Sequence, residues 1–119
     1  MEVQIFGTKK SADTRAALRF FAERRVRTHF VDFAERAASL GELKRFAGKF
    51  GVGALIDAES RRYAELGLRQ ARMADETWLA TLADEPLLLR VPLVRLVGGA
   101  HGLTVGAAEA EWKRWVETR

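Results

Sequence analysis

The sequence predicts an α/β domain with a mixed sheet, in which a βαβ unit is followed by a helical insertion and then by a ββα unit. Two observations lead to this prediction. Short apolar segments with strand-like alternation occur near both ends of the chain, and segments with helical periodicity fill its middle. The 119 residues suit one domain with a single sizeable core, so we expect a single domain over residues 1–119.

The N-terminal part predicts the βαβ unit. An apolar strand over residues 3–6 ends at Gly7, and a helix follows a polar loop, with Ser11 or Asp13 as its N-cap. Residues 28–33 then alternate like a second strand. Strand, helix and strand within about 33 residues fit a βαβ unit with a right-handed crossover.

The middle of the chain is predicted to be helical. Residues 39–42 match a capping box, and the helix that they start is expected to end at Gly51 and Gly53. A short turn ends at Gly67, and Asp75 is the predicted N-cap of a further helix.

The C-terminal part returns to strands. Apolar residues 87–89 lead into a strand over 91–97, and a turn at 98–102 joins it to a second arm over 103–106. A final helix is indicated by three apolar residues at helical spacing: Ala108, Trp112 and Trp115.

The charge pattern argues against a nucleic-acid interface. The formal net charge is +4, but the arginines are spread along the chain. Nucleic-acid binding usually requires basic residues gathered on one face, so a solvated surface is the favoured reading. No apolar run approaches the roughly 20 residues that cross a bilayer, and no basic segment leads into an apolar one at the start. We therefore expect no membrane partner and a cytoplasmic location.

The absence of cysteine excludes several chemistries. The chain has none, which removes disulfides, thiolate metal sites and a cysteine nucleophile. Its two histidines, His29 and His101, show no HExxH-like spacing. We predict no metal site and no cofactor.

The loop before the first helix carries a family resemblance. Ser11-Ala12-Asp13-Thr14-Arg15 resembles the redox loop of the arsenate reductase (ArsC) and Spx family, whose pattern is roughly Cys-x-x-Cys/Ser-Arg. On this resemblance Ser11 stands at the catalytic cysteine position, Thr14 at the second cysteine or serine position, and Arg15 at the family's arginine. The loop is therefore a degenerate redox loop.

Three further stretches resemble the family in the same order along the chain. Residues 31–33 and 39–43 are similar to its second strand and next helix, and residues 62–68 to its Y-x-x-L-G-L segment. Residues 84–94 are similar to its H-P-x-L-x-x-R-P-I segment. The resemblance implies a thioredoxin-like fold with a core over about 1–34 and 87–119 and a helical insertion over about 35–86. It also implies a cis peptide bond before Pro92.

The departures from the family pattern concern the anion site. The family's arsenate reductases use a cysteine nucleophile and three arginines that hold the oxyanion. The first arginine falls on Val91, with Arg90 one position early, and the second falls near Val105. The third falls near Gly53 or Asp57. The resemblance thus implies that the nucleophile and the three arginines are missing.

Two uses remain for the loop. A serine hydroxyl is a poor nucleophile without a general base, so Ser11 is favoured as a helix cap. Thr8, Lys9, Lys10 and Ser11 precede a helix N-terminus, where free N–H groups and the helix dipole favour anions. Weak binding of phosphate, sulfate or arsenate is a hypothesis for these four residues. The alternative is a pair of solvated lysines on an exposed loop.

The resemblance leaves two functions of different kinds. The favoured one is a non-catalytic binding or regulatory module, of the Spx type that binds the C-terminal domain of the RNA polymerase α subunit. The alternative is an arsenate reductase-like enzyme that uses an external thiol such as glutathione, with an oxyanion held at Thr8 and Ser11.

Overall fold

The computed structural model describes residues 1–98 and 102–118. The chain divides into two compact units. The sheet unit consists of Met1–Arg36 and Val91–Arg119, and the helical unit consists of Ala37–Arg90. Residues 99–101, which make up most of the predicted 98–102 turn, lie outside the described residues. Within the described part, no helix combines the length and apolar character needed to cross a membrane.

The sheet unit has the predicted mixed topology. Strand β1 (Glu2–Gly7) pairs in parallel with β2 (Arg27–Asp32) on one side and antiparallel with β3 (Leu93–Val97) on the other. Strand β4 (Leu103–Val105) pairs antiparallel with β3, which gives the order β2-β1-β3-β4. This βαβ and ββα arrangement confirms the thioredoxin-like fold.

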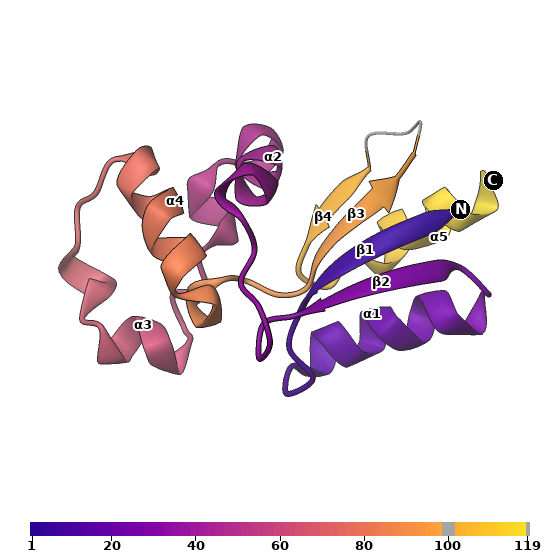
Figure 1. Ribbon diagram of the computed structural model, residues 1–119, viewed down its shortest axis with the longest axis horizontal. Coiled ribbons are helices and arrows are strands. Elements are labelled where there is room, and N and C mark those ends of the chain that lie inside the picture. Colours follow the sequence, from indigo (N-terminus) through magenta and orange to yellow (C-terminus); the bar gives the residue numbers. More distant parts are fainter. Residues whose placement is uncertain (99–101, 119) are drawn as a thin grey trace. The chain divides into compact units, whose positions relative to one another are not determined.

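Helices α1 (Ala12–Glu23) and α5 (Glu109–Glu117) pack on one face of this sheet (Figure 1). Every second residue of a strand points to the same face, so Val3 and Ile5 of β1 meet both helices. The core cluster between this face and the two helices contains nine buried residues: Val3, Ile5, Ala17, Phe20, Phe21, Val26, Val94, Trp112 and Trp115.

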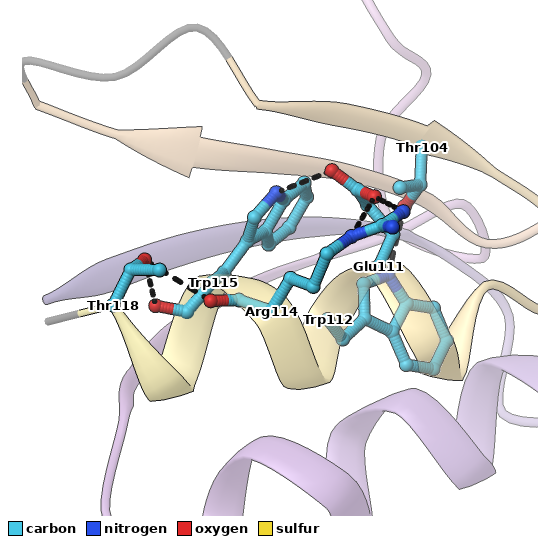
Figure 2. Close-up of polar contacts among 6 residues, drawn as sticks. All are labelled: Thr104, Glu111, Trp112, Arg114, Trp115 and Thr118. Carbon is cyan, nitrogen blue, oxygen red and sulfur yellow. Dashed lines mark hydrogen bonds and ion pairs between the residues drawn. The ribbon is translucent and has the colours of Figure 1, made fainter.

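A polar contact joins α5 to β4, and others lie within the helix itself. The indole Nε1 of Trp112 donates to the buried hydroxyl of Thr104, with 2.8 Å between the two atoms. The indole of Trp115 donates to Glu111 at 3.2 Å, and Arg114 pairs with the same carboxylate (Figure 2). Both tryptophans thus bury their rings while their N–H groups keep partners, which is the usual condition for burying tryptophan.

The helical unit contains three α-helices and three 3₁₀ turns among its described residues. The helices are α2 (Leu40–Phe50), α3 (Arg61–Glu65) and α4 (Asp75–Asp84). The turns are η1 (Val52–Leu55), η2 (Leu68–Gln70) and η3 (Pro86–Leu88). Apolar side chains form the interior of this unit. Five of them are at most 1% exposed: Leu43, Phe46, Leu55, Leu82 and Leu88.

Helix caps follow the sequence with one exception. Ser11, rather than Asp13, caps α1, and Ser39 forms the predicted capping box with Glu42. The prediction for α4 was wrong: Ala74 is the N-cap, without a side-chain bond, and Asp75 is already helical. An acidic residue in the first turn still interacts favourably with the helix dipole, so Asp75 keeps part of its expected role.

The return to strand begins later than predicted. Residues 86–88 form a 3₁₀ turn that starts at Pro86, and β3 begins at Leu93 rather than at 91. Proline suits the first position of a helical turn, and Pro92 has no N–H to donate to a strand neighbour. The units accordingly meet in sequence at 36/37 and 90/91, a few residues beyond the expected 34/35 and 86/87.

Candidate functional site

The loop between β1 and α1 uses its own hydroxyls to build a turn and a cap. The Oγ of Ser11 accepts from the backbone N–H of Thr14 at 3.1 Å, the N-cap bond of α1. The Oγ1 of Thr8 accepts from the N–H of Lys10 at 3.0 Å, and the carbonyl of Thr8 accepts from the N–H of Ser11 at 3.0 Å. These bonds give the loop one defined conformation.

The side chain of Arg15 is hydrogen-bonded to the loop. Its Nη1 donates to the carbonyl oxygen of Lys9, with 2.6 Å between the atoms. The charged donor thereby ties the first turn of α1 to the preceding loop. Lys9 and Lys10 are both exposed, so they can interact with ions only from the solvent side.

Thr14 lies beneath the loop and is fully buried. A Cβ built on Gly7 would lie 2.5 Å from the Thr14 Oγ1, far inside contact distance. The hydroxyl therefore rests against the end of β1, where only glycine leaves enough room. Among the described residues it has no hydrogen-bond partner, which makes Thr14 an unsatisfied polar group in the core.

Pro92 lies at the end of the sheet where the loop begins. The Val91–Pro92 bond is cis, as the family resemblance implied. Phe6 of β1 pairs with Leu93, so Pro92 follows in register beside the last residue of β1. Its carbonyl accepts from the N–H of Gly106 at 2.9 Å, which joins it to the end of β4.

The site lacks a partner that would activate Ser11. The Ser11 hydroxyl is bonded to a backbone N–H, and no side chain of the described residues bonds to it. His29 pairs with Glu2 at the opposite end of β1, and His101 lies outside the described residues. Within the described ranges no group of three or more metal-ligating side chains occurs. The geometry supports a capped helix end and a compact loop rather than a nucleophile.

None of the positions assigned to the family's oxyanion arginines holds an arginine. Val91 and Val105 are half-buried aliphatic residues, and Gly53 is exposed. Arg90 belongs to the helical unit, where its Nη2 donates to the carbonyl of Ile56 at 3.5 Å. Asp57 is acidic and would repel an anion.

Comparison with known proteins identifies the family. The model of the ArsC family matches residues 6–115. An arsenate reductase of Neisseria meningitidis serogroup A is 30% identical over 102 residues, which is 83% of this chain and 87% of that protein. The chain belongs to the ArsC family.

Solved structures agree with the ArsC assignment. An arsenate reductase from Vibrio cholerae superposes with a TM-score of 0.72 at 27% identity, covering 85% of this chain and 88% of that one. A Bacteroides fragilis protein described as ArsC family related gives a TM-score of 0.82 at 20% identity, with coverage of 96% and 97%. The second likeness shows the fold alone.

Sequence reasoning missed a basic groove on the sheet of this ArsC-family chain. Arg36 and Arg95 line it together with Gln4 and His29. The available signal was Arg95, a charged residue in the middle of the apolar strand Leu93–Val97. A charge at that position indicates a strand face that is not packed in the core.

Proposed function

We propose that this ArsC-family chain is non-catalytic and acts by binding, as a regulatory module of the Spx type. The observation that carries the proposal is the loop itself. Its serine caps α1 through a 3.1 Å bond, and the chain contains no cysteine that could take over a redox role. The strand–loop–helix geometry is thus retained without the sulfur that the family's chemistry needs.

The chemistry of serine supports the same conclusion. Its hydroxyl cannot be reduced and reoxidised, and as a nucleophile it needs a general base. The Ser11 hydroxyl instead accepts a backbone hydrogen bond. Arg15, the one residue that matches the family's loop arginine, donates to the carbonyl of Lys9.

The partner proposed from the Spx resemblance is the C-terminal domain of the RNA polymerase α subunit. This chain and the polymerase would both be cytoplasmic. Isothermal titration of the full chain with the purified domain tests this directly. A saturable heat change supports the proposal, and its absence at concentrations of about 100 μM would remove this partner.

An arsenate reductase that uses external thiols is the second candidate, because curated relatives carry that name. Two glutathione molecules would reduce one arsenate to arsenite and release glutathione disulfide and water. The loop would then only hold the oxyanion, through Thr8, Ser11 and the N-terminus of α1. We expect turnover with arsenate, glutathione and glutaredoxin to stay at the background rate. Turnover well above background would replace the first proposal.

Weak oxyanion binding at Thr8, Lys9, Lys10 and Ser11 is compatible with either function. The N-terminus of α1 favours anions, and the two lysines add positive charge. Amide shifts of these four residues during a phosphate titration measure it. We expect at most millimolar affinity because the backbone N–H groups of Lys10, Ser11 and Thr14 already donate within the loop.

A further inference from the structure

The sheet has a second face, opposite to the one on which α1 and α5 pack. Helices α1 and α5 pack on the face that carries Val3 and Ile5. The alternate residues Glu2 and Gln4 of β1 point to the opposite face. Among the described residues of the sheet unit, no helix covers that face.

A groove of about 410 Å³ runs across this face. The strand register explains how it forms: Gln4 is paired with His29 of β2 on one side and with Arg95 of β3 on the other. Their side chains therefore form a polar row across three strands. Arg36 lines the same groove, and the half-buried Val97 adds apolar surface beside the row, whereas Val31 lies at its base and is 6% exposed.

The groove carries an excess of positive charge. Glu2 is the one carboxylate among its described lining residues, and it is already hydrogen-bonded to His29 and paired with Arg27. Its Oε2 lies 2.9 Å from Nε2 of His29 and its Oε1 lies 3.7 Å from Nη1 of Arg27. The hydrogen bond from His29, aided by Arg27, lowers the pKa of Glu2 below its ordinary value. Arg95 forms no ion pair among the described residues.

We propose that this groove binds an extended acidic segment of a partner protein, with its carboxylates at Arg95 and Arg36 and an apolar side chain on Val97. This inference rests on the proposed binding function and specifies the chemistry of the partner. Arginine forms the strongest pairs with carboxylates because its planar guanidinium donates two parallel bonds.

The shape and lining of the groove favour a peptide over other anions. The groove is open to solvent, and both apolar and basic residues line it. A single phosphate would leave the apolar part unused and would stay hydrated. Single-stranded nucleic acid needs exposed aromatic rings for stacking. Phe30 is the one phenylalanine among the described lining residues, and it is half-buried and packs in part against the core of the sheet unit, so the groove offers no row of free rings.

The test is an amide-shift titration of the full chain with a short peptide of alternating glutamate and valine. We expect shifts at Gln4, His29 and Arg95, and weaker binding at high ionic strength. Arg95→Glu and Arg36→Glu should each weaken binding by about tenfold or more, because attraction becomes repulsion. Arg72→Glu, an exposed arginine of the helical unit, is the matched control and should change affinity by less than about twofold.

Three comparison probes make the test decisive. The same peptide with lysine in place of glutamate should not bind, and inorganic phosphate should bind this face much more weakly. A single-stranded oligonucleotide that binds the groove more tightly than the acidic peptide would overturn the inference. Equal binding of phosphate, shifts confined to the loop before α1, or self-association through this face would also overturn it. Circular dichroism verifies the fold of each variant, and Arg36→Glu serves if Arg95→Glu does not fold.

The result is independent of the RNA polymerase experiment. Loss of the α-subunit interaction with a peptide still bound in the groove removes only the Spx-type proposal. An α-subunit interaction that Arg95→Glu and Arg36→Glu leave unchanged, with no peptide bound, removes only the groove.

Discussion

Two buried threonines differ in whether their hydroxyl has a hydrogen-bond partner, and this decides how each hydroxyl affects stability. Thr14 and Thr104 are both at most 5% exposed. The hydroxyl of Thr104 accepts a 2.8 Å bond from the indole of Trp112, whereas that of Thr14 has no partner among the described residues. A buried polar group without a partner loses its hydration and gains nothing in return.

The same substitution should therefore have opposite effects at the two sites. Thr14→Val removes an unsatisfied hydroxyl at nearly constant shape, so we expect the free energy of unfolding to rise by about 1 kcal/mol. Thr104→Val leaves the Trp112 N–H unpaired and should lower it by about 1–3 kcal/mol. Urea denaturation of both variants measures the difference. Destabilisation by Thr14→Val would mean that its hydroxyl has a partner in solution.

Gly7 is coupled to Thr14 by steric contact. Gly7→Ala places a Cβ 2.5 Å from the Thr14 Oγ1 and 2.7 Å from its Cγ2, and should destabilise the protein by about 1–3 kcal/mol. Thr14→Ala in the same chain removes both contacts. The double variant should therefore lose less stability than the sum of the two single variants, by at least about 0.5 kcal/mol.

Gly48 provides the control for this cycle. It lies in α2, and a Cβ there meets nothing within 4 Å. Gly48→Ala should stabilise the helix by about 0.5–1 kcal/mol through propensity alone. Additive effects of Gly7→Ala and Thr14→Ala would contradict the proposed contact.

At the scale of elements, an ion pair ties α3 to the end of α4 within the helical unit. Arg62 donates to Glu85 through Nε at 2.9 Å and Nη2 at 2.7 Å, a bidentate arrangement. It also lies 3.6 Å from Glu65. The hydrogen bonds from Arg62 lower the pKa of Glu85, and the bonds to Glu85 raise the pKa of Arg62. The pair therefore joins the five-residue helix α3 to the residue that follows α4.

The lowered pKa of Glu85 fixes the sign of a pH effect. A carboxylate with a lowered folded-state pKa stabilises the fold above its unfolded-state pKa, and this contribution is lost as the pH falls through the folded-state value. Glu85→Gln should therefore destabilise the protein at pH 7 and have less effect near pH 3. Glu65→Gln, which removes the longer contact, is the control. Chemical denaturation at both pH values checks the result, and an equal loss at both would contradict it.

The sheet of the whole molecule was predictable from local patterns. The strand-like alternation of apolar residues near the two ends and the helical periodicity between them are properties of short segments. The order of these segments predicted the mixed sheet. The late start of β3 was not predicted because residues 87–89 are as apolar as a strand. Pro86 instead starts a 3₁₀ turn there, and the backbone N–H of Arg90 bonds to Leu55.

The candidate sites differ in how much of each could be predicted from the sequence. The Ser11 cap was predictable because it depends on contacts three residues apart. The bond from Arg15 to the Lys9 carbonyl depends on a side-chain conformation that no pattern specifies. The groove on the sheet joins Gln4, His29 and Arg95, which are brought together only by strand pairing. Which face of the sheet remains uncovered depends on where both helices pack.

A thiol at position 11 tests whether the proposed lack of catalysis depends on one residue or on the whole molecule. In the Ser11→Cys variant the thiol lies at the N-terminus of α1, where backbone N–H groups stabilise a thiolate. We expect alkylation at pH 7 to be about tenfold faster than in Thr118→Cys, whose thiol would lie at the C-terminal end of α5. Measured iodoacetamide rates compare the two variants.

A reactive thiol should still not give an arsenate reductase. Oxyanion chemistry also needs positive charge around the substrate, and the positions assigned to the family's arginines hold residues such as Val91 and Val105. We therefore expect the Ser11→Cys variant to reduce arsenate no faster than the unmodified chain in the glutathione assay. Clear turnover by this variant would show that the rest of the site is intact and that one substitution separates the chain from its catalytic relatives. Fast alkylation without turnover would mean that the proposed lack of catalysis depends on several parts of the molecule, which agrees with the proposed binding function.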